Sequence, residues 1–177
     1  MPAPADVILD RPSVTVVLMG VSGSGKSTVM QRMVERLGWP FAEGDDFHTN
    51  ANVAKMAAGR PLTDDDRWPW LRAIAAWIGE RERVAENAVV TCSALRKRYR
   101  DLLLDGHPSV RFAHLVVDRD LLASRMAQRR GHYMPPVLLD SQLNTLEPLR
   151  DDEAGFVISG DLSPDRIVDE VVSALQL

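Results

Sequence analysis

The sequence predicts an α/β fold in which helices cover both faces of a parallel β-sheet. Segments with the pattern of strands alternate with segments of helical periodicity along the whole chain of 177 residues, and this alternation is typical of parallel sheets. Residues 88–92 form a continuous apolar run, as strands buried on both faces do. No repeat, low-complexity tract or linker divides the chain, so we expect a single domain over residues 1–177.

The first elements follow from local patterns. Residues 1–12 are rich in proline and predict a loose leader. Residues 14–19 are apolar and mostly β-branched, which favours a strand. Residues 26–37 carry apolar side chains at helical spacing and stop before Gly38, because glycine commonly ends helices. Residues 39–43 then predict a short second strand.

The remaining elements continue the alternation. Thr63 followed by three acids predicts a helix start, because a threonine side chain and early carboxylates stabilise the first amide groups of a helix. The glycine and prolines of residues 131–137 predict an irregular loop. We expect helices at residues 51–58, 63–87, 97–105, 118–130, 138–147 and 164–176, and strands at residues 88–92, 110–117 and 156–158.

The loop between the first strand and the first helix fits the pattern G-x-x-x-x-G-K-[ST] without a gap. Its glycines let the backbone curl so that N–H groups face inward, and the helix N-terminus adds its positive dipole end. Lys26 can reach the β- and γ-phosphates of a nucleotide, and the Ser27 hydroxyl can ligate Mg²⁺. This loop, the P-loop, therefore predicts nucleoside triphosphate binding and leaves the phosphate acceptor open. Its residues are Gly20, Val21, Ser22, Gly23, Ser24, Gly25, Lys26, Ser27 and Thr28.

Acidic residues follow the second predicted strand. An enzyme that phosphorylates a hydroxyl needs a carboxylate to orient it and take its proton. Asp45 and Asp46 lie at a strand end beside the P-loop strand, where α/β proteins place site residues. Their position alone does not decide between them, nor between this role and that of loop acids that cap a helix. His48 is a further candidate for contacts with substrate hydroxyls.

Arginines gather on the helix predicted at residues 118–130. Arg125 and Arg129 lie four positions apart on one face, just before the loop at 131–137. This arrangement predicts a mobile lid that closes over the triphosphate. The alternative is a solvated basic helix.

Two further groups are weaker candidates on local signal. Arg67 follows the acids of a helix start and has the geometry to hold a carboxylate or phosphate. Arg96 belongs to a basic segment that follows the C-terminal end of the strand at 88–92, and the start of this segment is a candidate for contact with an anionic substrate. We expect its later members, Lys97, Arg98 and Arg100, on the surface.

Composition excludes several classes of function. A net charge of −4 argues against nucleic-acid binding. No apolar run is long enough to span a membrane, and residues 1–12 lack the apolar core of a signal peptide, so we expect a cytoplasmic protein. Cys92 is the only cysteine, which excludes a disulfide framework. The histidines show no metal-ligand spacing, so the expected metal is Mg²⁺ that arrives with the nucleotide.

Several sequence blocks together resemble gluconokinase, also called gluconate kinase. The resemblance covers roughly residues 14–160, and the block from residue 44 to residue 71 is much more specific than the P-loop. The matching blocks are Gly44-Asp45-Asp46-Phe47-His48, Asn52-x-x-Lys55-Met56, Gly59-x-Pro61-Leu62-Thr63-Asp64-x-Asp66-Arg67-x-Pro69-Trp70-Leu71, Cys92-Ser93-Ala94-Leu95, Tyr99-Arg100 and Arg129-x-Gly131-His132-Tyr133.

The resemblance implies a three-layer P-loop kinase fold with strand order 2-3-1-4-5, a mobile lid and a homodimer. It implies transfer of the γ-phosphate of ATP to the 6-hydroxyl of D-gluconate. Asp45 then matches the acid that acts as base or hydroxyl orienter, Arg125 a residue near the adenine, and Arg129 a lid residue near the phosphates. His48, Arg67, Arg96 and His132 become candidates for substrate binding, and which arginine holds the gluconate carboxylate stays open.

Two alternatives compete with this interpretation. One is another small-molecule kinase of similar fold, acting on shikimate or on a nucleoside monophosphate. The other is a GTPase switch, which requires the guanine-binding pattern [NT]-K-x-D. None of the three lysines, Lys26, Lys55 and Lys97, has an aspartate two positions later, so the sequence argues against the switch.

Overall fold

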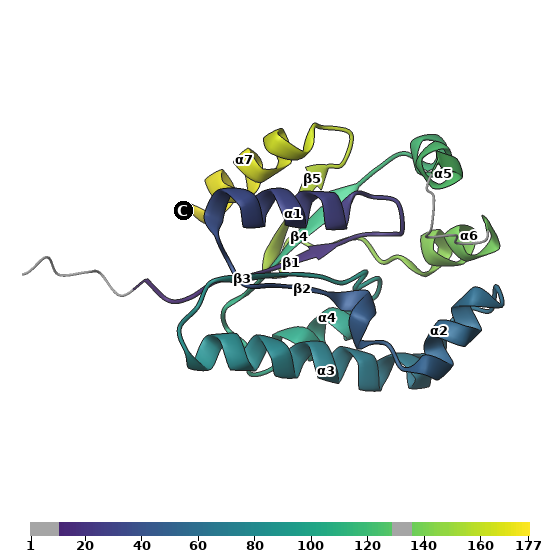
Figure 1. Cartoon of the computed structure of the whole chain (residues 1–177), viewed down its shortest axis with the longest axis horizontal. Coiled ribbons are helices and arrows are strands. Elements are labelled where there is room, and N and C mark those ends of the chain that lie inside the picture. The colour runs from purple at the N-terminus through teal and green to yellow at the C-terminus, as the bar shows by residue number, and fades with distance from the viewer. Residues whose placement is uncertain (1–10, 129–135) are drawn as a thin grey trace, which may run out of the picture.

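The computed structural model describes residues 11–128 and 136–177 and shows a parallel sheet between two layers of helices (Figure 1). Within these residues the sheet has five strands in the order β2-β3-β1-β4-β5, and each neighbouring pair is parallel. The predicted fold class and strand order are therefore confirmed. The strands are β1 Thr15–Met19, β2 Phe41–Glu43, β3 Ala88–Thr91, β4 Val110–Val116 and β5 Gly155–Ser159.

The helices agree with the predicted segments apart from their ends. The third helix ends at Arg83, earlier than predicted, because Ala85 has a φ of 55° and leaves the helical conformation. The sixth begins at Pro136, within the predicted loop at 131–137. The helices are α1 Lys26–Leu37, α2 Asn50–Ala57, α3 Asp64–Arg83, α4 Lys97–Leu104, α5 Arg119–Gln128, α6 Pro136–Thr145 and α7 Pro164–Leu175, with a 3₁₀ helix, η1, at Gly44–Phe47.

Alternate residues of the central strand point into two separate cores. Val16 and Leu18 pack with side chains of α1 and α7, whereas Val17 and Met19 pack with side chains of α3 and α4. All four are fully buried. Successive side chains of a strand point to opposite faces, so β1 carries apolar residues at successive positions from Val16 to Met19. Figure 1 shows the same division, with α1 and α7 on one face and α3 and α4 on the other.

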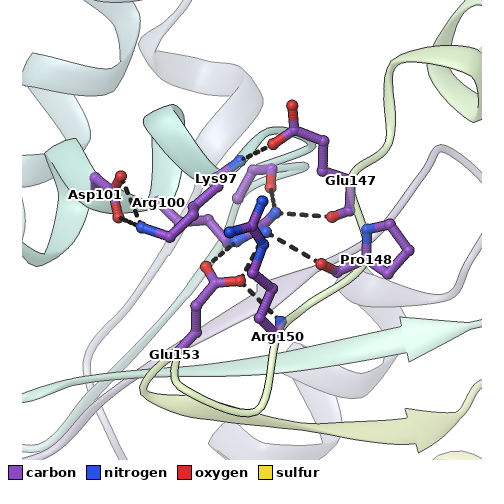
Figure 2. A network of polar contacts seen from close by, with 8 residues as sticks. Lys97, Arg100, Asp101, Glu147, Pro148, Arg150 and Glu153 are labelled. Carbon is purple, nitrogen blue, oxygen red and sulfur yellow. Dashed lines mark hydrogen bonds and ion pairs between the residues drawn. The ribbon is translucent and has the colours of Figure 1, made fainter.

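A buried ion pair fastens α4 to the segment that leads into β5. The Arg100 side chain is only 1% exposed, and its Nε and Nη2 donate to the two carboxylate oxygens of Glu153 at 2.6 and 2.9 Å. Nη1 donates to the carbonyl oxygens of Ala94 and Glu147 at 2.9 and 3.1 Å (Figure 2). The prediction that the later basic residues of this helix lie on the surface is therefore wrong for Arg100, while Arg98 is exposed.

The P-loop, η1 and the residues after β3 all follow the carboxyl ends of parallel strands, so they meet at one edge of the sheet. Figure 1 shows α2, α5 and α6 at this same end of the molecule. Among the helices that the structure describes, none is both long and apolar enough to cross a bilayer.

Candidate active site

The P-loop has the curled backbone that the sequence predicted. Gly20, Gly23 and Gly25 have φ values of 139°, 83° and 97°, which residues other than glycine rarely adopt. A Cβ on Gly20 would also lie 2.8 Å from the carbonyl oxygen of Leu115. The Nζ of Lys26 donates to the carbonyl oxygens of Gly20 and Val21 at 2.9 and 3.0 Å. The lysine ammonium therefore lies against the loop whose amides form the predicted anion site.

A cavity beside the P-loop, called the main cavity below, brings together most of the predicted site residues. Its wall combines the P-loop with η1, the start of α3, the end of β3 and α6. The predicted residues on this wall are Ser22, Gly23, Gly25, Lys26, Ser27, Asp45, His48 and Arg67.

The main cavity also separates the two candidate acids. Asp45 lines it and its side chain is 92% exposed, whereas Asp46 is not part of the wall. Arg96, the residue that precedes α4, is not part of the wall either. Among the arginines that the structure describes, Arg67 is the one that lines this cavity.

His48 lies flat against an indole inside the cavity wall. Its side chain is 4% exposed, and its ring stacks on Trp70 with centroids 4.2 Å apart and planes at 15°. Its Nε2 lies 3.9 Å from Oδ1 of Asp45. Burial lowers the pKa of His48 from its usual value, with the charge of Arg67 acting in the same direction and that of Asp45 opposing it. The imidazole is therefore neutral at physiological pH.

Arg67 is held at the cavity by Tyr99 of α4. Its Nη1 donates to the Tyr99 hydroxyl at 3.0 Å, and its guanidinium lies 5.3 Å from the centre of the tyrosine ring. The Tyr99 hydroxyl in turn donates to Asp64. An arginine in this position adds a fixed positive charge to the wall, which suits an anionic ligand.

Several cavity residues were missed by sequence reasoning. Gln142 of α6 accepts a hydrogen bond from the backbone N–H of Ser22 at 2.7 Å, so α6 contacts the P-loop directly. Glu43 ends β2 and accepts a hydrogen bond from the Thr91 hydroxyl at 2.6 Å. Glu43 could have been predicted from the sequence, because it lies at the end of a predicted strand, where site residues of α/β proteins are found. No local pattern predicts Gln142 as a site residue. Only the fold brings it to Ser22 of the P-loop, which lies 120 positions earlier in the sequence.

Cys92 lies in the cavity wall but is chemically inert. It is 2% exposed, and burial raises the pKa of its thiol to about 12. A thiol in this environment stays protonated and is a poor nucleophile. The cavity chemistry therefore rests on oxygen and nitrogen groups.

A second hollow lies on the other side of the P-loop, since Gly23 and Gly25 line both spaces. Arg125 of α5 crosses it, with Nη2 donating to the Gly160 carbonyl at 2.9 Å and Nη1 to the Gly23 carbonyl at 3.3 Å. Apolar side chains of Leu162 and Ile167 complete the wall with Thr28. Arg129, His132 and most of the predicted lid loop lie outside the described residues.

The oxygen groups at the main cavity fit a hard divalent cation. In the described part of the chain, no three His, Cys, Asp or Glu side chains are grouped as a metal site. The Ser27 hydroxyl and the Glu43 carboxylate line the same cavity. Mg²⁺ prefers such oxygen ligands and commonly takes its remaining ligands from phosphates and water. The site therefore fits a magnesium ion that enters with a nucleotide.

Comparisons with known proteins show which family the chain resembles. An AAA domain family matches residues 15–149. The gluconokinase of Gluconobacter oxydans (strain 621H) is 45% identical over 161 residues, which cover 91% of this chain and 90% of that protein.

Two solved structures are similar in both sequence and shape. A gluconokinase from Sinorhizobium meliloti 1021 has a TM-score of 0.82 and 44% identity, covering 94% of this chain and 93% of that one. An unliganded sugar kinase from Janibacter sp. HTCC2649 has a TM-score of 0.88 and 45% identity, covering 93% of this chain and 95% of that one. With the P-loop, the acidic strand end and this degree of identity over nine-tenths of its length, the chain belongs to the gluconokinase family.

Proposed function

We propose that the protein transfers the γ-phosphate of ATP to the 6-hydroxyl of D-gluconate, giving 6-phospho-D-gluconate and ADP. The observation that carries this proposal is the main cavity, whose wall combines Lys26 and Ser27 of the P-loop with Asp45 and Arg67. A donor loop and an acceptor-binding wall that share one cavity allow direct transfer between two bound substrates. Membership of the gluconokinase family favours gluconate over shikimate or a nucleoside monophosphate as the acceptor.

The proposed chemistry assigns one role to each charged group. The gluconate 6-oxygen forms a bond to the γ-phosphorus, the bond from phosphorus to the ADP oxygen breaks, and the hydroxyl proton passes to the Asp45 carboxylate. Lys26 stabilises the negative charge that develops on the phosphoryl oxygens. Ser27 would hold Mg²⁺, which neutralises charge on the β- and γ-phosphates.

The acceptor needs a cationic group for its carboxylate and hydrogen-bond groups for its hydroxyls. Arg67 supports the first role because its guanidinium is held at the cavity by Tyr99. His48 also lines this cavity and stays a candidate for contacts with the hydroxyls. Arg96 has less support because it is absent from the cavity wall. His132 stays a prediction.

The second hollow fits the purine of ATP. It adjoins the P-loop and combines the Arg125 guanidinium with apolar side chains, and a flat aromatic base can stack or pack against both. Arg129 stays the predicted lid residue at the phosphates. The single domain, the homodimer and the cytoplasmic location also stay predictions, which sedimentation velocity and cell fractionation would test.

The proposal is tested by ADP release in the presence of Mg²⁺ and ATP with gluconate, shikimate or a nucleoside monophosphate as acceptor. We expect gluconate alone to stimulate ADP release, and phosphorus–proton correlation NMR to place the new phosphate on carbon 6. Stimulation by shikimate or a nucleotide but not by gluconate would contradict the proposal.

A further inference from the structure

Asn52 of α2 is a buried polar residue for which the proposed mechanism has no role. It is 4% exposed, and its Nδ2 donates to the backbone carbonyl oxygen of Asp66 at 2.9 Å. The same nitrogen lies 3.4 Å from Nδ1 of His48. A carbonyl oxygen only accepts hydrogen bonds, so the atom that faces Asp66 is the amide nitrogen and not the amide oxygen. The contact with Asp66 therefore determines which way the Asn52 amide points.

This orientation determines where the His48 ring carries its proton. An amide nitrogen has two hydrogens, and one of them is directed at Asp66 while the other faces the ring. Nδ1 of His48 must then present its lone pair, because two N–H groups that point at each other repel. In a neutral imidazole the proton is therefore on Nε2. The lowered pKa of His48 is consistent with the neutral form.

The protonated nitrogen points towards the candidate base. Nε2 lies 3.9 Å from Oδ1 of Asp45, and the Asp45 side chain is 92% exposed and able to change rotamer. The ring itself is clamped, because it stacks on Trp70 and the indole Nε1 of Trp70 donates to the Gly44 carbonyl at 2.7 Å. The contact is longer than a hydrogen bond, and a change of the Asp45 rotamer would let the fixed N–H hold one carboxylate oxygen and leave the other for the acceptor hydroxyl.

We propose that Asn52 is a positioning residue for phosphoryl transfer: it keeps His48 as an Nε2–H donor, and His48 orients the Asp45 carboxylate. The catalytic part of this inference rests on the proposed gluconate kinase activity, whereas the tautomer does not. In the opposite tautomer the Nε2 lone pair would face a carboxylate and repel it. The groups that face the ring are Asn52 of α2, Trp70 and Arg67 of α3, and Asp45 of η1.

The tautomer is measurable without any substrate. Nitrogen-15 NMR of histidine-labelled protein distinguishes protonated from unprotonated ring nitrogens, and the His48 signals are the ones that His48→Gln removes. We expect the neutral ring of His48 to carry its proton on Nε2 in the unsubstituted protein. A proton on Nδ1 would overturn the inference, and the tautomer itself is read from the unsubstituted protein.

Asn52→Asp tests the link to turnover. A carboxylate only accepts, so in the neutral ring it draws the proton to Nδ1 and leaves Nε2 bare, and the kinetics are measured at a pH high enough to keep the ring neutral. A hydrogen bond to a charged group is worth roughly a factor of 10 to 100, so we expect kcat for gluconate to fall about 10- to 100-fold with KM changed less than about threefold. The NMR signals of this variant should show protonated Nδ1.

Two further variants separate positioning from structural support. Thr63→Ala removes the cap that accepts from the backbone N–H of Asp66, so it loosens the same junction without contacting His48. We expect its kcat to stay within about threefold of the unsubstituted protein. His48→Gln places an amide N–H donor near the position of Nε2 but has no tautomer, so adding Asn52→Asp to it should lower kcat by less than about threefold.

Equal losses from Asn52→Asp in both backgrounds, or an equal loss in Thr63→Ala, would overturn the positioning role. If gluconate is not phosphorylated but the Nε2–H tautomer is found, the proposed function fails while the Asn52–His48 assignment stands. If gluconate is phosphorylated and the tautomer is Nδ1–H, the proposed function stands and this inference fails.

Discussion

Replacing Arg100 by methionine is expected to destabilise the protein severely. The substitution removes the guanidinium but keeps an apolar side chain of similar length, so it leaves Glu153 as a buried carboxylate that is 7% exposed and has lost its partner. It also removes the donor to the carbonyl oxygens of Ala94 and Glu147. Breaking a buried ion pair by removing one partner costs about 3–5 kcal/mol. This is a large share of the roughly 5–15 kcal/mol by which domains are stable.

The loss depends on pH in a predictable direction. Burial is the largest single influence and opposes ionisation of Glu153, but the hydrogen bonds from Arg100 and the Arg150 backbone N–H, together with the charges of Arg100 and Lys97, outweigh it and lower the pKa of Glu153 below 4.5. The pair therefore stabilises the unsubstituted protein above that pH and less as the pH falls through the lowered pKa. In the variant the unpaired, buried Glu153 has a raised pKa and takes up a proton more easily. The difference in stability should accordingly shrink on going from about pH 7 to about pH 4.

The assay is urea unfolding at both pH values, followed by circular dichroism. The matched control is Arg98→Met, two positions earlier on the same helix. The Arg98 side chain is 48% exposed and pairs with Asp64. An exposed pair contributes less than about 1 kcal/mol, so the control should remain near the unsubstituted protein. A loss below about 1 kcal/mol for Arg100→Met, or one that does not shrink with acid, would refute this account of the buried pair.

Three other outcomes are expected. Asp45→Asn should lower kcat about 10²–10⁴-fold and Asp46→Asn only a few fold, because Asp45 alone of the two lines the main cavity; steady-state kinetics would contradict this if the two variants behaved alike. Cys92 should resist iodoacetamide in the folded protein and react after unfolding, since its pKa is raised to about 12 by burial; mass spectrometry showing rapid labelling of native protein would count against it. Gly44→Ala should destabilise the fold by about 3 kcal/mol or more, because its Cβ would overlap the Thr91 carbonyl oxygen; a thermal melt unchanged from the original would disprove this.

Most of the fold was predictable because its signals are local. The P-loop glycines, the helix start at Thr63 and the apolar run at 88–92 each lie within a few residues of the structure they produce. The burial of Arg100 was not predictable in this way. A basic helix predicts a solvated face, and the partner that makes burial favourable, Glu153, comes 53 positions later. The charges of the helix residues themselves give no indication of that pairing.

In the candidate site, too, local signals predicted some residues and contacts between distant parts of the chain brought in others. Lys26, Ser27 and Arg67 were predicted from motifs, whereas local sequence did not show that Asp45 lines the main cavity and Asp46 does not. Gln142 needed the whole path of the chain, since α6 contacts the P-loop from 120 positions later in the sequence. Sequence patterns thus identify residues that act through their neighbours in the chain, and miss those that act through contacts in space.

The beginning of α1 has a consequence for the stability of the whole protein. Within the described residues, Gly25 caps this helix without a side-chain hydrogen bond, and its first turn contains no acid. Many helices stabilise these amide groups with a neighbouring side chain, and a glycine cap forgoes roughly a few tenths of a kcal/mol by leaving them for a phosphate. The nucleotide therefore completes a helix as well as serving as a reactant. The melting temperature should rise with its concentration, by the equivalent of about 2.7 kcal/mol at one hundred times the dissociation constant.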